Sequence, residues 1–475
     1  MERKNMTSKY GEGRSIRKYL LYIVGSVCLL AGIVFMPLGL TAQAAATNWP
    51  TFMGSNAHTG YNASETVLTA SVARQVKVHW KDHAGGSISS QPVIVNGAIY
   101  WGSWDGYEHA TDLNGHQRWQ TFLGKTTPPA SQGCTPASAG VSGTATVADI
   151  SIKGHMTPVV LVSGGNSHFY ALDATNGKVL WDTKLASSAD YMLWAGSTLY
   201  KGSVYVGVAS YGDCPLVAGR VVQMNASTGA VEHSFTTVAA GCIGGGIWMA
   251  PTIDEKTDTL YVSTGTLAPC KTLEKLSYAL IALHTSDLSL SSSWQIPNSQ
   301  DAKDSDFGST PTLFSATVNG KARQMIGLVN KNGVYYAFDR TNIAAGPLWE
   351  AKVSTSPNNI ASSAWDGKRL YVGGTQTTIK GKPCLGSVRA VNPATGAFLW
   401  EYCAPSKVID ALTVVPGLVF TGAGSHVVVL DAATGRELYV YRDTSHASTF
   451  WGGVTVSNGV MYMGNEAGNL YAFGL

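Results

Sequence analysis

Residues 170–181 read YALDATNGKVLW, and this phrase decides the fold because it recurs along the chain. Close copies read VNPATGAFLW at 391–400 and LDAATGRELY at 430–439. Looser copies occupy 112–119, 225–235, 284–294 and 339–349. Self-similarity at a period of roughly 40 to 60 residues is typical of one supersecondary unit stacked many times. The sequence therefore predicts a repeat protein.

Each phrase predicts two antiparallel strands joined by a short turn. An alternating apolar stretch precedes the Asp or Asn, and a second stretch follows the Gly and usually ends in Trp. Asp or Asn opens a type I turn, and Gly supplies the positive φ that closes the hairpin with a bulge. The terminal Trp is large and mostly apolar, so we expect it to wedge between neighbouring sheets rather than to contact a ligand.

Two further strands precede each phrase, as in residues 91–100 and 455–464, which is the layout of a propeller blade. Units begin near residues 86, 140, 194, 244, 306, 359, 411 and 451, which makes eight. The last unit ends at Leu475 after three strands, and the unpaired strand 76–80 carries the terminal-Trp pattern. We expect an all-β, eight-bladed β-propeller over residues 47–475. Its blades are four-stranded and antiparallel, and the N-terminal strand closes the ring.

Residues 1–46 have the composition of an export segment. Six Lys and Arg precede an uncharged apolar run from Tyr19 to Leu40, and small residues at A-x-A spacing follow, as in a signal peptide. The run is also long enough to span a bilayer if it is not cleaved. Both interpretations, signal peptide and N-terminal membrane anchor, place the propeller outside the cytoplasm, either secreted or held at the outer face of the cell membrane. Contact with the membrane is expected only through this segment.

The charge balance argues against a nucleic-acid partner. The chain has 33 Lys and Arg against 30 Asp and Glu, and residues 1–44 hold six of the former and two of the latter. The remainder is close to neutral and contains no basic run. Without a positive stripe to neutralise phosphates, a nucleic-acid function has little support.

Six cysteines follow the apolar segment, at positions 134, 214, 242, 270, 384 and 403. An even number in an oxidising compartment predicts disulfides. Folding the chain about its turns brings Cys384 nearly opposite Cys403, and Cys214 opposite Cys242, so we expect these two bridges. The pair Cys134 with Cys270 follows only by elimination.

The residues that break the repeat concentrate on one face of the predicted ring. In a four-stranded blade the loops after the second and fourth strands share a face, and the repeated turns lie on the other. The glycine-rich stretch 241–248 ends at Trp248, whose indole would suit a flat aromatic cofactor that approaches closely. Asp213 and Asp306, with an oxygen from Thr266, would suit a hard cation such as calcium. A site is therefore expected at the mouth of a central funnel.

The repeated phrase, the eight units and two segments, NWPTF at 48–52 and AHTGY at 57–61, resemble the pyrroloquinoline quinone (PQQ) dehydrogenases, above all the polyvinyl-alcohol-dehydrogenase-like members. The resemblance covers nearly everything after residue 48. It implies an exported quinoprotein that oxidises an alcohol or polyol by hydride transfer to PQQ, with the help of a divalent cation. It also implies a separate electron acceptor.

The resemblance assigns chemical roles to three side chains. Trp248 resembles the tryptophan that stacks on the quinone. Asp306, in SDFG at 305–308, matches the catalytic aspartate that removes the hydroxyl proton of the alcohol. Lys331, ahead of NGVYY at 332–336, matches the basic residue that bonds the reactive carbonyls of the quinone.

The resemblance also assigns a cation site and two further cofactor contacts. Asp213 resembles the acidic calcium ligand, and Thr266 takes the place of the usual asparagine ligand, with Asp306 as the third member of the set. Ser210 and Asn359 correspond to cofactor-contacting positions.

The match is incomplete at the site. The vicinal cysteine pair of the alcohol dehydrogenases is absent, and Ser89 stands where many members have a cofactor-binding glutamate. No C-x-x-C-H motif occurs, so the chain carries no covalent c-type haem. The alternative function is a non-catalytic propeller that acts as an extracytoplasmic binding or assembly scaffold.

Each candidate also has a purely structural interpretation. Trp248 can be a packing residue, Asp306 a loop cap and Lys331 a solvated turn residue. Asp213 lies beside an expected disulfide and can simply end a loop. A serine hydrolase is disfavoured because no G-x-S-x-G motif is present.

Overall fold

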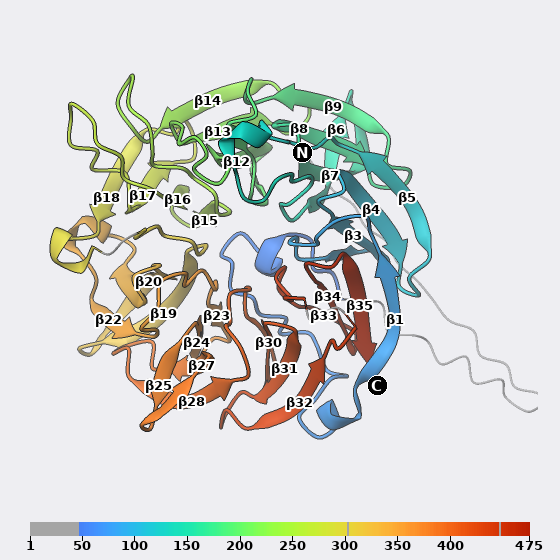
Figure 1. The fold of residues 1–475 in the computed structure, drawn as a ribbon, viewed down its shortest axis with the longest axis vertical. Coiled ribbons are helices and arrows are strands. Elements are labelled where there is room, and N and C mark those ends of the chain that lie inside the picture. The colour runs from blue at the N-terminus through green and yellow to red at the C-terminus, as the bar shows by residue number, and fades with distance from the viewer. Residues whose placement is uncertain (1–46, 302–303, 446–447) are drawn as a thin grey trace, which may run out of the picture. The chain divides into compact units, whose positions relative to one another are not determined.

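The structure, a computed structural model, describes residues 47–301, 304–445 and 448–475. Within these residues the chain forms eight antiparallel sheets arranged as blades around a central axis (Figure 1). In seven blades the four principal strands follow one another in sequence from the axis to the rim. The predicted all-β, eight-bladed propeller is confirmed.

Blades 1 to 4 follow one another along the chain. Blade 1 contains β2 (Val93–Val95), β3 (Ala98–Gly102), β4 (Tyr107–Asp112) and β5 (Gln117–Phe122). Blade 2 contains β6 (Thr146–Ile152), β7 (His155–Ser163), β8 (His168–Asp173) and β9 (Val179–Lys184). Blade 3 contains β11 (Thr198–Tyr200), β12 (Ser203–Ser210), β13 (Arg220–Asn225) and β14 (Val231–Thr236), with the short β10 (Tyr191–Met192) also paired to β12. Blade 4 contains β15 (Thr252–Asp254), β16 (Thr259–Ser263), β17 (Ala279–His284) and β18 (Leu290–Gln295).

Blades 5 to 8 complete the ring. Blade 5 contains β19 (Thr312–Val318), β20 (Lys321–Val329), β21 (Val334–Asp339) and β22 (Trp349–Lys352). Blade 6 contains β23 (Ala364–Trp365), β24 (Leu370–Gly374), β27 (Gly386–Val391) and β28 (Phe398–Ala404), with an extra hairpin of β25 (Thr377–Ile379) and β26 (Lys382–Cys384). Blade 7 contains β29 (Thr413–Val415), β30 (Leu418–Ala423), β31 (His426–Asp431) and β32 (Glu437–Arg442). Blade 8 contains β33 (Thr455–Ser457), β34 (Val460–Gly464), β35 (Asn469–Gly474) and β1 (Lys77–His83).

Short 3₁₀ helices lie in the connections: η1 (Phe52–Gly54), η2 (Ala73–Gln75), η3 (Ala130–Gln132), η4 (Asn298–Gln300) and η5 (Ile343–Ala345). None of the helices in the described part of the chain has the length and apolar character that a bilayer crossing requires. The predicted signal peptide or anchor, residues 1–46, lies outside the described residues.

Blade 8 is built from both ends of the propeller. β1 pairs antiparallel with β35, with Lys77 opposite Gly474 and His83 opposite Asn469. β1 is therefore the fourth, outermost strand of blade 8, and it covers the edge of β35 that would otherwise be exposed. The predicted closure by strand 76–80 is confirmed, and the strand is longer than expected because it continues to His83.

The repeated turn has the geometry that its sequence predicts. In blade 2 the Gly177 N–H donates to the Asp173 carbonyl (2.8 Å), and the Thr175 N–H donates to the Asp173 carboxylate (2.8 Å). Gly177 has a φ of 74°, a left-handed conformation that glycine adopts without a Cβ clash. The register of β8 and β9 shifts by one residue beside the turn, which is a bulge.

The terminal Trp of a blade packs against the turn of the next blade. Trp119 of blade 1 donates its indole N–H to the Ala174 carbonyl (3.0 Å), and a Cβ added at Gly177 would lie 2.6 Å from the indole ring. The glycine is therefore required both by its φ and by the neighbouring ring. The same arrangement pairs Trp80 with Gly115, Trp181 with Gly229, Trp349 with Gly396, and Trp400 with Gly435. The predicted structural wedge is confirmed.

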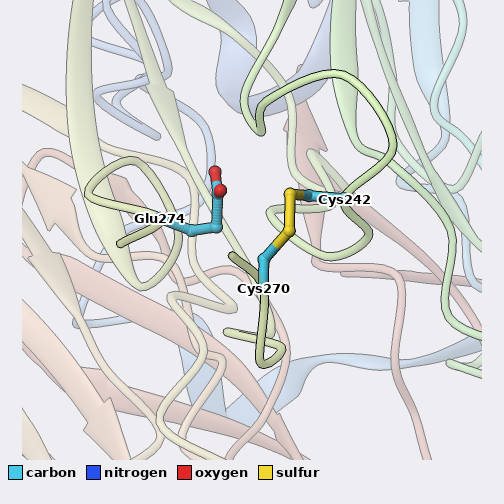
Figure 2. A group of neighbouring side chains, drawn as sticks. All are labelled: Cys242, Cys270 and Glu274. Carbon is cyan, nitrogen blue, oxygen red and sulfur yellow. A yellow bond between two sulfur atoms is a disulfide. The ribbon is translucent and has the colours of Figure 1, made fainter. Parts of the chain in front are cut away.

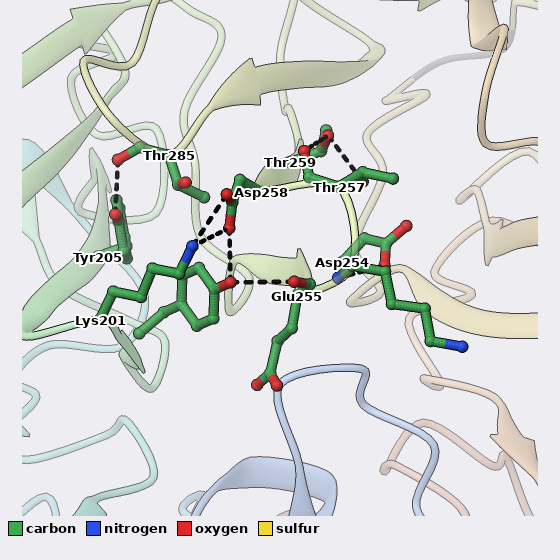
Figure 3. Close-up of polar contacts among 10 residues, drawn as sticks. Lys201, Tyr205, Asp254, Glu255, Thr257, Asp258, Thr259 and Thr285 are labelled. Carbon is green, nitrogen blue, oxygen red and sulfur yellow. Dashed lines mark hydrogen bonds and ion pairs between the residues drawn. The ribbon is translucent and has the colours of Figure 1, made fainter.

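The joint between blades 3 and 4 uses polar contacts instead (Figure 3). β14 carries His233 where other blades carry the wedge Trp. Across this joint Lys201 forms an ion pair with Asp258 (2.7 Å), and the Tyr205 hydroxyl donates to the Thr285 carbonyl (2.7 Å). Both charged side chains of the ion pair are exposed, so water screens it and it adds little stability.

Threonines on the innermost strands tie neighbouring blades together near the axis. Thr312 of blade 5 donates its hydroxyl hydrogen to the Ser363 carbonyl at the start of blade 6 (2.9 Å). Equivalent bonds run from Thr146 to Ser197, Thr198 to Pro251, Thr252 to Pro311, Thr413 to Val454, and Thr455 to Pro92. Each bond satisfies two buried polar groups at once. Six blade joints are thus held by a threonine hydrogen bond near the axis, and five joints by a Trp that packs on the glycine of the next turn.

Residues 49–62 run around the axis and bond to the innermost strands (Figure 1). Backbone hydrogen bonds join this segment to blades 1, 2, 4, 5, 6 and 7, for example from the Ile253 N–H to the Asn56 carbonyl (2.9 Å). Phe52, in η1 of this segment, lines a cavity on the axis that is described below. The segment therefore forms the floor of that cavity.

Three disulfides lie in the described part of the chain. They join Cys384 to Cys403, Cys134 to Cys214, and Cys242 to Cys270. The predicted Cys384–Cys403 bridge is confirmed. The predicted Cys214–Cys242 bridge is wrong, and so is the Cys134–Cys270 pair obtained by elimination.

The error has a physical reason in the hairpin of blade 3. Cys214 and Cys242 would face each other only if β13 and β14 continued in register toward the mouth. β13 instead begins at Arg220 and β14 ends at Thr236, and the free loops turn to different neighbours. Cys214 reaches the connection between blades 1 and 2, and Cys242 reaches the loop of blade 4.

Candidate functional site

A cavity of about 620 Å³ lies on the axis, on the face that carries the non-repeated loops. We call this face the mouth, and the face of the repeated Asp-to-Gly turns the turn face. Of the seven side chains predicted for the site, the structure places six at this cavity: Ser210, Asp213, Trp248, Thr266, Asp306 and Lys331. The floor contains Phe52, so the cavity is a funnel above the N-terminal segment.

Trp248 is held by glycine backbone on neighbouring loops. A Cβ added at Gly308 would lie 2.7 Å from the indole, and one added at Gly265 would lie 3.2 Å from it. The Gly265 N–H also donates to the Gly246 carbonyl (2.8 Å), which ties the loop of blade 4 to the glycine-rich stretch. The indole Nε1 is buried and has no hydrogen-bond partner among the described residues. These glycines allow the indole to lie at the cavity wall, where a flat molecule could stack on it.

Asp306 and Lys331 form a buried ion pair beside Trp248. Lys331 Nζ lies 3.0 Å from Asp306 Oδ2 and 3.1 Å from the carboxylate of Asp304. The same ammonium lies 5.1 Å from the centre of the Trp248 ring. The backbone fixes the pair as well, because the Lys331 N–H donates to the Asp306 carbonyl (2.9 Å). Asp306 is 7% exposed, Lys331 14% and Asp304 44%, so the pair is mostly shielded from water and Asp304 faces the mouth.

Burial governs the protonation of this pair. It raises the pKa of Asp306 to about 6, since loss of water and repulsion from Asp304 and Asp213 outweigh the attraction of Lys331. Burial alone would lower the pKa of Lys331, but the carboxylates of Asp306 and Asp304 raise it above its ordinary value. At neutral pH the site therefore holds an ionised, moderately basic carboxylate next to a fixed positive charge.

Thr266 connects two carboxylates of the cavity. Its hydroxyl oxygen lies 2.6 Å from Asp213 Oδ2 and 3.2 Å from Asp306 Oδ1. A hydroxyl has one hydrogen, so it donates to one of these carboxylates at a time. Two carboxylates and a hydroxyl that converge in this way form an oxygen set of the kind that a hard cation takes.

Asp213 is positioned by contacts with the connection between blades 1 and 2. It has a φ of 57° and precedes Cys214, which is bonded to Cys134. The Tyr211 hydroxyl donates to the Pro136 carbonyl in that connection (3.0 Å). Loops from three parts of the ring therefore fix the carboxylate that contacts Thr266.

The two remaining predicted contacts behave differently. Ser210 lines the cavity, and its hydroxyl accepts from the Val217 N–H (3.1 Å). Asn359 is fully buried and does not line the cavity, since its side-chain oxygen accepts from the Thr375 N–H (2.9 Å). The amide of Asn359 therefore supports a loop of blade 6.

Cys242, Cys270 and Glu274 form a second cluster on the mouth loops (Figure 2). Their ligand atoms lie close together, but the two sulfur atoms are bonded to each other and offer no thiolate. The Glu274 carboxylate accepts from the Ala239 N–H (3.1 Å) and from the Thr272 hydroxyl. The cluster is a loop clamp and not a metal centre.

Sequence reasoning missed part of the cavity wall. Trp104, Trp194 and Trp451 line it, and so does Asp410. None of these tryptophans follows a repeated turn, so none can be a wedge residue. Their position in the sequence could therefore have marked them as candidates for the cavity wall. Among the described lining residues, Lys331 is the one basic side chain, and the acidic ones are Asp213, Asp304, Asp306 and Asp410.

Comparison with known proteins gives the same architecture. The family model described as outer membrane protein assembly factor BamB matches residues 144–268 and 319–475. A polyvinylalcohol dehydrogenase from Sphingopyxis sp. (strain 113P3) is 26% identical over 356 residues, which are 61% of this chain and 53% of that relative. The chain therefore spans about half the length of this curated relative.

Two solved structures show the likeness in three dimensions. A quinohemoprotein alcohol dehydrogenase from Pseudomonas putida HK5 has a TM-score of 0.74 at 15% identity, over 90% of this chain and 80% of that one. BamB from Moraxella catarrhalis has a TM-score of 0.55 at 15% identity, over 84% and 98%. At these identities the structural likeness establishes the fold alone.

Proposed function

The chain belongs to the family described as outer membrane protein assembly factor BamB, and from this premise we propose that it is a PQQ-dependent oxidoreductase that oxidises an alcohol. The observation that carries the proposal is the meeting of Asp306, Lys331 and Trp248 at one funnel. These residues come from two adjacent blades and break the repeat, whereas a scaffold has no need of a buried ion pair at its axis. The polyvinylalcohol and quinohemoprotein alcohol dehydrogenases among its relatives support the same reaction class.

The residues of the cavity fit the reactive end of PQQ. Trp248 offers a ring for the quinone plane, and Lys331 offers a positive charge for its carbonyl oxygens. Asp213, Thr266 and Asp306 would hold a divalent cation, for which we propose calcium. PQQ also carries three carboxylates, and the cation would offset part of the negative charge that the four aspartates already bring. Ser210 lines the same cavity and is a further proposed contact.

In the reaction, Asp306 acts as the base. Its carboxylate takes the hydroxyl proton of the alcohol, and its raised pKa makes it a better proton acceptor than an exposed aspartate. When bound, PQQ would accept the hydride that leaves the carbinol carbon, so that the alcohol becomes a carbonyl compound. Lys331 holds positive charge beside the atoms that gain electron density, and burial keeps water from screening it.

Compartment and electron acceptor belong to the same proposal. Three disulfides suit an oxidising environment outside the cytoplasm, which agrees with the export segment predicted at residues 1–46. The sequence contains no c-type haem motif, so the electrons of the substrate would pass to a separate acceptor.

The proposal is tested by reconstitution. Purified protein titrated with PQQ and calcium is expected to bind the chromophore and to reduce an artificial dye with an alcohol as donor. Asp306→Asn is expected to lower kcat by about 100-fold or more at unchanged thermal stability, because the base is lost. Asp304→Asn is the comparison variant: it removes a carboxylate that contacts Lys331 but keeps the proposed base, so it is expected to lower kcat much less. Folded protein that binds no quinone and oxidises no alcohol would refute the enzymatic function.

The second candidate is a binding or assembly scaffold. The family description and the BamB structure favour it, and so does the excess of carboxylates in a cavity meant for an anionic cofactor. In that case Asp306→Asn and Lys331→Ala leave the function of the protein unchanged. The same titration with PQQ separates the two candidates, because a scaffold gives no bound chromophore.

A further inference from the structure

Three tryptophans form a wall of the cavity that no proposed catalytic step uses. The indole of Trp104 lies 6.1 Å from that of Trp194 and 5.9 Å from that of Trp451, measured between ring centroids. The rings are tilted to each other by 57° and 55°. Each is only partly buried, and all three line the cavity. Partly exposed indoles gathered in one place on a loop face are a costly use of apolar surface unless they meet a ligand.

The wall presents carbon rather than hydrogen-bond donors. The Trp104 N–H donates to the Ser89 hydroxyl oxygen (2.8 Å), and the Trp194 N–H donates to the Ser210 carbonyl (2.9 Å). Both indole nitrogens are therefore occupied within the protein. A sugar would need free polar partners for its several hydroxyls and a flat ring face to lie on. A tilted set of rings, two of them with occupied N–H groups, suits a hydrocarbon surface instead.

Two tryptophans of the wall, Trp104 and Trp451, lie across the funnel from the Asp306–Lys331 pair. Trp194 leads into blade 3 and extends the wall toward blade 4. Trp104 belongs to blade 1 and Trp451 leads into blade 8, whereas Trp248 leads into blade 4 and Asp306 into blade 5. In a ring of eight, blades 1 and 8 stand opposite blades 5 and 4 (Figure 1). One molecule can therefore have a polar end near Asp306 and an apolar body against the tryptophans. The carboxylates of a quinone would be poorly placed against this wall, which has no basic side chain.

We propose that Trp104, Trp194 and Trp451 form a substrate subsite for the hydrocarbon body of an alcohol, and that they select alcohols with a longer aliphatic body over short alcohols and sugar alcohols. This inference rests on the proposed function and deepens it. The subsite holds the carbon chain while the hydroxyl-bearing carbon lies toward Asp306 on the opposite side. Each methylene buried on the wall contributes about 0.8 kcal/mol at most, or about fourfold in affinity.

The test is a chain-length series on the protein loaded with PQQ and calcium. Ethanol, butan-1-ol, hexan-1-ol and sorbitol are compared by kcat/KM. The wild type is expected to prefer hexan-1-ol to ethanol by tenfold or more and to use sorbitol worst. Trp451→Ala is expected to reduce the hexanol-to-ethanol ratio about tenfold, and Trp451→Phe to restore part of it. Leu273→Ala, which changes an exposed apolar side chain away from the cavity, is the control and leaves the ratio unchanged.

A second measurement separates this proposal from the proposed function. Saturation-transfer NMR with cofactor-free protein detects binding of hexan-1-ol without turnover, and the signal is expected to weaken in Trp104→Ala and Trp451→Ala. Binding of hexan-1-ol without any oxidation would retain the subsite and refute the dehydrogenase. Oxidation with equal kcat/KM for ethanol and hexan-1-ol would retain the dehydrogenase and overturn the subsite. A preference for sorbitol that Trp104→Ala abolishes would also overturn it, because the wall would then be a sugar platform.

Discussion

The two faces of the propeller are built by different rules. On the turn face, five joints use the same solution, in which the Trp of one blade packs on the Gly of the next turn. On the mouth the longer loops follow no common pattern, and the structure there is held by three disulfides, a buried ion pair and hydrogen bonds between loops. The side chains proposed for the reaction all line the cavity at the mouth. A repeated face gives rigidity to the ring, and this rigidity allows the other face to vary.

The largest loss of stability is expected when a wedge tryptophan between two blades is removed. Trp119→Ala removes a buried ring that fills a blade joint, and it leaves the Ala174 carbonyl with one donor, the Tyr100 hydroxyl, in place of two. The free energy of unfolding should fall by about 3–5 kcal/mol, as measured by urea denaturation. Binding of ligands at the mouth should be unaffected in the protein that remains folded. A loss below about 1 kcal/mol would mean that the wedge does not hold the joint.

Removing a disulfide at the mouth should lower the free energy of unfolding somewhat less than Trp119→Ala does, and it should also weaken cation binding at the site. The double variant Cys134→Ser, Cys214→Ser removes a bridge between residues 80 apart in sequence and should lower the free energy of unfolding by about 2–4 kcal/mol. It also frees the loop that holds Asp213, so calcium should bind more weakly, as measured by calorimetry. Cys384→Ser with Cys403→Ser is the matched control. Its bridge closes a separation of 19, so the loss should be about 1 kcal/mol smaller, and calcium binding should not change.

Glu108 offers a test inside a blade, where one residue departs from the repeat. The other seven blades have Phe169, Val221, Leu280, Tyr335, Val388, Val427 or Leu470 at this position of the third strand. Glu108 is fully buried, and neither carboxylate oxygen has a partner among the described residues. Burial raises its pKa well above the ordinary value for glutamate. The folded protein therefore keeps a proton that the unfolded chain loses, and stability falls as pH rises toward the raised pKa.

Replacing Glu108 by the residue of another blade should remove this sensitivity. Glu108→Leu is expected to raise the free energy of unfolding by about 1–3 kcal/mol at pH 9 and to flatten its decline between pH 5 and pH 9. Burial also raises the pKa of Asp410 to about 7 and that of Asp306 to about 6, so part of the decline should remain, and Asp410→Asn should reduce it further. An unchanged pH profile in Glu108→Leu would contradict the assignment. Thermal unfolding followed over pH gives the measurement.

The smallest loss of stability is expected near the axis, where threonine hydrogen bonds tie neighbouring blades together. Thr312→Val keeps the shape of the side chain and removes the hydrogen bond to the Ser363 carbonyl. It also removes the bond that Thr312 accepts from the Ser363 hydroxyl, which keeps the Tyr335 hydroxyl as a partner. The free energy of unfolding should fall by about 1 kcal/mol. Thr317→Val, on the outward half of the same strand, serves as the control and should change stability less. Equal effects of the two variants would show that the bond near the axis has no special weight.

The sequence anticipated the repeated parts of the molecule better than the site. The turn of residues 170–181 depends on Asp173 and Gly177, which are four residues apart, so its geometry is local and readable. The Cys384–Cys403 bridge was correct because β27 and β28 stay in register up to the cysteines. The Cys214–Cys242 prediction failed because the strands of that hairpin end before the cysteines and the loops separate.

At the site, the sequence indicated which residues are candidates but not how far apart their side chains lie. Asp306, Lys331 and Trp248 stood out because their segments depart from the repeat, and the structure places them around one cavity. Asn359 also stood out, yet its side chain bonds to Thr375 inside blade 6. The tryptophan wall was invisible, because Trp104 and Trp451 are far apart in sequence and nothing local marks their approach.

By itself, the sequence determined the blade, the number of blades and the closure of the ring by strand 76–80, because each depends on contacts within a unit or between identical units. Only the tertiary structure decided which loops meet over the axis, how Cys134 and Cys242 are paired, and which aromatic side chains face Asp306. The physical reason is that a loop on the mouth is stabilised by its neighbours around the ring. Those neighbours are brought together by the curvature of the whole propeller and not by the sequence of any single blade.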